Sequence, residues 1–89
     1  MTAEQYLADQ LERLMGLPLA SKEDEECWDR EAADVQTTLE KQFPDFGLEH
    51  FLYHFFTDSD IRWKDAGYRE RQHRAVAEYV ARLRHDKHR

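Results

Sequence analysis

All five phenylalanines of the chain lie in one stretch, residues 43–57, which reads FPDFGLEHFLYHFFT. Leu48, Leu52 and Tyr53 fill most of the gaps between them, in a chain whose charged residues make up 36% of the total. Exposing so many apolar side chains to water is unfavourable, so other parts of the chain have to cover them. We therefore expect this stretch to be the element on which the rest of the molecule packs.

The remaining sequence predicts a small all-α domain spanning residues 1–89. Only three glycines and two prolines occur, which argues against a turn-rich β protein. Apolar residues recur at helical spacing, and we predict a four-helix bundle packed around the Phe-rich third helix. The expected helices cover residues 3–15, 22–42, 46–57 and 68–85, with a short helical turn at 61–65 and a frayed end at 85–89.

Capping residues set most of these boundaries. Thr2 and Gln5 have the spacing of a capping box, and Ser21 precedes three acids in the first turn of the second helix. Pro44 ends that helix, and Asp45 is the expected cap of the third. Gly16 has the position of a left-handed C-cap at the end of the first helix. The turn at 61–65 is expected to bury its two large apolar residues. Those two residues are Ile61 and Trp63.

Several protein classes do not fit the composition. The single cysteine, Cys27, allows no disulfide within the chain, which suits a reducing compartment. The N-terminus lacks the basic and apolar regions of a signal peptide, and no apolar run approaches the ~18–20 residues needed to cross a bilayer. We expect a cytoplasmic protein that does not bind membranes.

Charge is divided unevenly along the sequence. Residues 1–60 carry 15 acids and 4 bases, whereas residues 61–89 carry 4 acids and 9 bases. The net charge of −6 therefore conceals a negative part followed by a positive part.

The acidic stretch at the start of the second helix is the main candidate site. Seven acids lie between Glu23 and Asp34, and the alternative is that they form only a solvated helix surface. A negative surface of this kind would speed and orient association with a basic partner. We predict a non-enzymatic protein-binding module, an adaptor or inhibitor that docks on a basic surface of another protein. Small acidic proteins of bacterial or phage origin often inhibit nucleic-acid-processing proteins in this way, and by analogy of size and charge alone the partner would belong to that class. The candidate binding residues are Glu23, Asp24, Glu26, Asp29 and Asp34, with Trp28 as an aromatic anchor if it is exposed.

The arginines of the last predicted helix support an alternative, a module that binds nucleic acid through phosphate contacts. The strongly negative remainder of the chain makes this interpretation the less favoured one. The arginines would otherwise pair with the acids of the first two helices, within a monomer or across a homodimer. They are Arg69, Arg71, Arg74, Arg82 and Arg84.

A second alternative is metal binding by His50 and His54, which have the i,i+4 spacing of a helical chelate. A third ligand would have to come from elsewhere, with His73 or an acid of the second helix as candidates. Otherwise the two histidines are simply polar residues on the outer face of an apolar helix. No phosphate loop or nucleophile motif occurs, so we expect neither an enzyme nor a cofactor.

Overall fold

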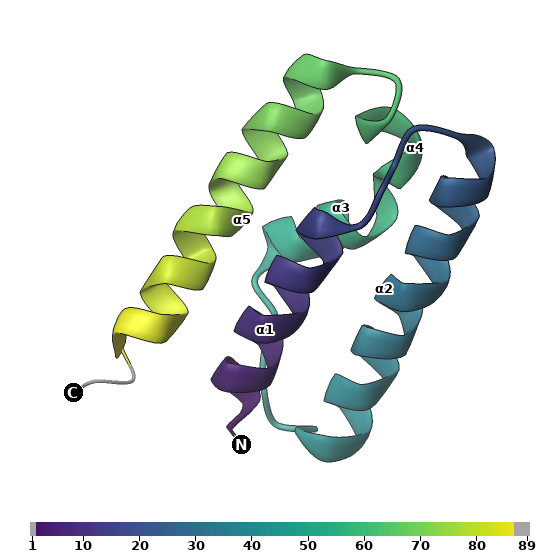
Figure 1. The fold of residues 1–89 in the computed structure, drawn as a ribbon. Coiled ribbons are helices and arrows are strands. Elements are labelled where there is room, and N and C mark those ends of the chain that lie inside the picture. Colours follow the sequence, from purple (N-terminus) through teal and green to yellow (C-terminus); the bar gives the residue numbers. More distant parts are fainter. Residues whose placement is uncertain (1, 87–89) are drawn as a thin grey trace.

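A computed structural model describes residues 2–86 of the chain (Figure 1). These residues form helices and no strand, which confirms the all-α prediction. There are five helices in this part of the chain rather than four and a turn. They are α1 (Ala3–Gly16), α2 (Lys22–Gln42), α3 (His50–Thr57), α4 (Ser59–Arg62) and α5 (Ala66–Asp86).

The predicted capping box begins α1. The Thr2 hydroxyl accepts a hydrogen bond from the Gln5 N–H at 3.1 Å, and the Gln5 side chain accepts one from the Thr2 N–H at 2.8 Å. At the other end of α1, the prediction that Gly16 forms a left-handed C-cap is wrong, because no glycine among the described residues has positive φ. The chain instead leaves the helix at Leu17, which is extended (φ −72°, ψ 144°), as a residue before proline prefers.

The bounds of α2 match the predicted range. The Ser21 hydroxyl accepts a hydrogen bond from the Asp24 N–H at 3.1 Å, and the helix ends two residues before Pro44. Its inward stripe is also the predicted one, with Trp28, Val35 and Leu39 buried.

The third helix is shorter than predicted and is not capped by Asp45. It starts at His50, after an extended Glu49 (φ −62°, ψ 140°) whose side chain makes no capping hydrogen bond. The N–H of Phe46 bonds to the Phe43 carbonyl in a turn, and Gly47, which has low helix propensity, follows it. Phe46 therefore packs on the core from a connection rather than from a helix.

The expected turn at 61–65 is displaced to α4, and its predicted inward residues are wrong. Ile61 is 42% exposed and Trp63 is half-buried, whereas Ser59 and Arg62 are buried. Residues 59 and 62 are three apart and share one side of a helical turn, so starting the turn two residues earlier rotates Ile61 outward.

The core is centred on α1 as much as on the Phe-rich helix. Leu7, Leu11 and Leu14 are completely buried, and α1 lies between α2 and α5 in Figure 1. On the other side, α3 contributes Leu52 and Phe55, both completely buried, and packs against α2, α4 and α5. The Phe-rich stretch is thus one half of the core rather than its only centre.

The last helix begins at Ala66 and extends to Asp86, so it includes two residues that were expected to fray. The rest of that predicted frayed end, residues 87–89, lies outside the described residues. Val76, Val80 and Leu83 face the core. None of the helices formed by residues 2–86 is both long and apolar enough to cross a membrane.

Candidate functional site

Three acids of α2 project away from the core on the side opposite its buried stripe. Glu23, Glu26 and Asp34 are exposed, and none of them takes part in an ion pair within residues 2–86. Arg30 is exposed on the same side of the helix, and its charge offsets one of the three carboxylates. We call Glu23, Glu26 and Asp34 the acidic face of α2.

Two further candidate acids are engaged in local structure. One carboxylate oxygen of Asp24 accepts a hydrogen bond from the Ala20 N–H at 3.0 Å, next to the start of the helix. Asp29 accepts a 2.5 Å hydrogen bond from the Ser59 hydroxyl, which joins α2 to α4. These two side chains stabilise the helix start and the α4 contact, so they are less free than the acidic face to meet a partner.

Trp28 cannot serve as an exposed aromatic anchor in this structure. It is 2% exposed, and its indole N–H donates a 2.9 Å hydrogen bond to the Leu14 carbonyl of α1. Its ring meets Phe55 edge-on, with the centroids 5.2 Å apart. The residue belongs to the core, as its place in the apolar stripe of α2 indicates.

Two acids of α2 are paired, but their partners do not come from α5. Glu31 forms a 2.6 Å ion pair with Arg13 of α1. Glu25 is buried and accepts a 2.8 Å hydrogen bond from the Trp63 indole, and Lys22 lies 3.5 Å away. The indole hydrogen bond, more than the lysine, lowers the pKa of Glu25.

The negative and positive helices stand on opposite sides of α1 (Figure 1). No ion pair between α2 and α5 occurs in the described part of the chain, and their backbones do not come into contact. The acids of α2 are therefore separated in space from the bases of α5.

Four of the five candidate arginines of α5 contact another side chain among the described residues. Arg84 pairs with Asp9 and Glu12 of α1, and Arg74 pairs with Glu70 one turn away. Arg71 and Arg82 lie over tyrosine rings, 6.0 and 5.6 Å from the centroids of Tyr68 and Tyr79. Arg69 lines a pocket beside α1. Arg69, Arg71, Arg74 and Arg82 remain exposed and Arg84 is half-buried, so contact of these side chains with a phosphate backbone stays a prediction.

His50 and His54 are both exposed on α3, with ring centroids 5.2 Å apart. His54 Nδ1 lies 3.8 Å from an Asp58 carboxylate oxygen. No group of three histidine, cysteine or acidic side chains that could hold a metal ion occurs among residues 2–86. The proposed third ligand, His73, packs against Phe55 instead, with ring centroids 6.2 Å apart.

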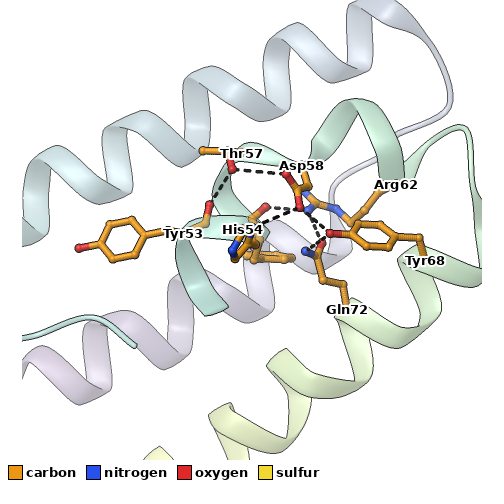
Figure 2. Close-up of polar contacts among 8 residues, drawn as sticks. Tyr53, His54, Thr57, Asp58, Arg62, Tyr68 and Gln72 are labelled. Carbon is orange, nitrogen blue, oxygen red and sulfur yellow. Dashed lines mark hydrogen bonds and ion pairs between the residues drawn. The ribbon is translucent and has the colours of Figure 1, made fainter. Parts of the chain in front are cut away.

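The sequence analysis missed a buried polar junction around Arg62, which Figure 2 shows in close-up. Arg62 is completely buried, and its guanidinium carbon lies 4.3 and 4.6 Å from the ring centroids of Trp28 and Phe55. Its Nη1 donates hydrogen bonds of 2.6 Å to the Phe55 carbonyl and to the Gln72 side chain. Burial lowers the pKa of Arg62 to about 10, so the group remains charged at neutral pH.

A chain of hydrogen bonds continues from this arginine to Asp58. Gln72 donates to the Tyr68 hydroxyl at 3.1 Å, and that hydroxyl donates to Asp58 at 2.5 Å (Figure 2). The hydrogen bond to Asp58, followed by burial, raises the pKa of Tyr68. Nε and Nη2 of Arg62 are buried and have no hydrogen-bond partner within the described residues. The only sequence signal for this junction was the position of Arg62 one helical turn after Asp58 and Ser59.

Comparisons of the chain with protein-family models, with curated proteins and with solved structures found no match.

Proposed function

We propose that the protein is a non-enzymatic binding module whose acidic face on α2 docks on a basic surface of another protein. In this proposal it acts as an adaptor or inhibitor, with a nucleic-acid-processing protein as a natural kind of partner. Its scaffold is an up-and-down four-helix bundle, in which α3 and α4 together take the place of the third helix.

The single observation that carries the proposal is the unpaired state of Glu23, Glu26 and Asp34, which have no ion-pair partner among residues 2–86. A carboxylate that is already paired at the surface has little left to offer a partner, whereas an unpaired one adds to the field that steers association. Complementary charges across an interface raise the association rate and reject wrong partners more than they increase affinity.

The test compares capture by two variants of equal net charge. In the first, Glu23→Gln, Glu26→Gln and Asp34→Asn remove the acidic face. In the second, Glu4→Gln, Glu49→Gln and Glu78→Gln remove three exposed acids that lie outside α2. Each immobilised protein is incubated with lysate of the native host, and captured proteins are identified by mass spectrometry.

We expect the wild type and the second variant to capture the same basic protein and the first variant to lose it. Capture should also weaken as salt is raised, because salt screens exposed charges beyond about 10 Å at 0.1 M. Circular dichroism checks that all three proteins are equally helical. Equal capture by both variants would contradict the proposal.

A further inference from the structure

A pocket of about 210 Å³ opens beside Trp28, on the side of α2 turned away from the acidic face. The end of α1, the connection after it, α2 and the start of α5 form its walls. Five of its lining residues are apolar and two are basic, and none is acidic. They are Leu14, Met15, Leu17, Leu19, Trp28, Arg69 and His73.

The pocket is lined by two basic residues and no acidic one, although the whole molecule has a net charge of −6. Arg69 is exposed and forms no ion pair within residues 2–86. His73 beside it is half-buried, and burial, followed by the charges of Arg62 and Arg69, lowers its pKa. Its ring is therefore a neutral hydrogen-bonding group at pH 7, next to a guanidinium that is always charged.

A second positive group stands behind the pocket wall. The guanidinium of Arg62 lies 4.3 Å from the centroid of the Trp28 ring, and that ring is part of the lining. Arg62 has no carboxylate in ion-pair contact among the described residues, and the more distant Asp58, Asp29 and Asp60 offset only part of its charge, which raises its pKa against the effect of burial. Charge complementarity therefore favours an anionic group at this end of the molecule.

The remaining walls suit a hydrocarbon. Met15, Leu17 and Leu19 are only partly buried against the core, so part of their apolar surface is available to be covered. The volume is below the roughly 300–1,000 Å³ of sites for drug-sized ligands, which limits the occupant to a small molecule.

We propose that this pocket binds a small monocarboxylate with a short apolar chain. The carboxylate lies at Arg69 and His73, and the chain lies against the partly exposed Met15, Leu17 and Leu19. The site is independent of the acidic face, which lies on the other side of α2.

The test is a titration of the 89-residue protein, monitored by two-dimensional NMR of its amide and indole N–H groups. Hexanoate is the probe, hexanol supplies the same chain without charge, and acetate supplies the charge without the chain. We expect hexanoate to cause saturable chemical-shift changes at the Trp28 indole and at the amides of Arg69 and His73. Both controls should bind at least about tenfold more weakly. Loss of a charge-assisted hydrogen bond accounts for a factor of this size with hexanol, and loss of apolar contact accounts for it with acetate.

Variants on α5 separate a specific site from general attraction to arginine. Arg69→Gln should weaken hexanoate binding about tenfold, because it removes the charged donor at the pocket. Arg82→Gln removes an equally exposed arginine from the same helix and should leave binding unchanged. Amide dispersion in the ligand-free spectra checks that both variants are folded. Equal binding of hexanol, unsaturable shifts, or wild-type affinity in Arg69→Gln would overturn the proposal.

Discussion

The two ends of the buried interior are held together in different ways. Beneath α1, the core consists of completely buried leucines, Leu7, Leu11 and Leu14, which have no polar side-chain atoms. At α4, the equally buried Arg62 lies against two aromatic rings, Trp28 and Phe55, and donates hydrogen bonds to the Phe55 carbonyl and the Gln72 side chain. Apolar burial has no preferred direction, whereas hydrogen bonds fix distances and angles.

This difference assigns the two regions different roles. The leucine core stabilises the folded state through apolar burial alone, and burying each such side chain contributes roughly 1.5–3 kcal/mol. The Arg62 junction contributes less for its size, because burial lowers the pKa of the guanidinium to about 10 and leaves Nε and Nη2 unpaired. Its contribution is to fix how α4 sits against α2 and α5.

The largest effect is expected in the leucine core. Leu11→Ala should lower the free energy of unfolding by about 3 kcal/mol, because it removes buried methyl groups and leaves a cavity. Urea denaturation at pH 7 measures this loss. Thr37→Ala, an exposed change on α2, is the control and should stay within about 0.5 kcal/mol of wild type. A loss below about 1 kcal/mol for Leu11→Ala would mean that α1 is not central to the core.

A smaller loss is expected when the junction loses its charge but keeps its volume. Arg62→Met should lower the free energy of unfolding by about 1–2 kcal/mol, since relief from burying a charge offsets part of the lost hydrogen bonding. Arg62→Ala should lose more, because it opens a cavity between Trp28 and Phe55. The same urea titrations apply. If Arg62→Met lowers the free energy of unfolding by more than Leu11→Ala does, the proposed difference in role between the leucine core and the Arg62 junction is wrong.

The hydrogen bond from Tyr68 to Asp58 tests the junction through pH. The pKa of Tyr68 is raised in the folded protein, so its stabilising contribution is complete below pH 10 and is lost as pH rises through the folded pKa. Tyr68→Phe should therefore lower the free energy of unfolding by about 1 kcal/mol at pH 8 and by less at pH 11. Urea denaturation of both proteins at the two pH values isolates the contribution of Tyr68. Tyr79 and Arg62 titrate in both proteins, so their effects cancel in the difference between wild type and variant. A pH-independent difference would show that this hydroxyl does not donate to Asp58.

The smallest effect is expected for the surface ion pairs at the edge of the leucine core. Arg84→Gln removes the contacts of α5 with Asp9 and Glu12, which are exposed to solvent. Exposed pairs add little to stability and are screened by salt. Thermal unfolding should show a slight decrease in Tm at low salt and none at ~1 M NaCl, where screening acts within about 3 Å. A decrease that persists at high salt would indicate packing by the Arg84 side chain rather than its charge.

Sequence reasoning located the helices well because their boundaries depend on neighbouring residues. The Thr2–Gln5 capping box and the Ser21 cap are local hydrogen bonds, and both occur in the structure. It failed at α3, which starts at His50, after Gly47, rather than at residue 46. It also failed at α4, which starts two residues before the predicted turn and therefore buries other side chains. Among the candidate binding residues, it placed Trp28 in the right stripe, but only the structure gave its 2% exposure.

The sequence by itself determined an all-helical chain, its capped helix ends, its apolar stripes and the separation of acids from bases along its length. Those features follow from periodicity and local hydrogen bonding, which act over a few residues. Only the tertiary structure decided that α1 separates α2 from α5 and that Arg62 is buried while Ile61 is exposed. The reason is that burial of a polar side chain depends on partners distant in sequence, here Trp28, Phe55 and Gln72, which only the folded chain brings together.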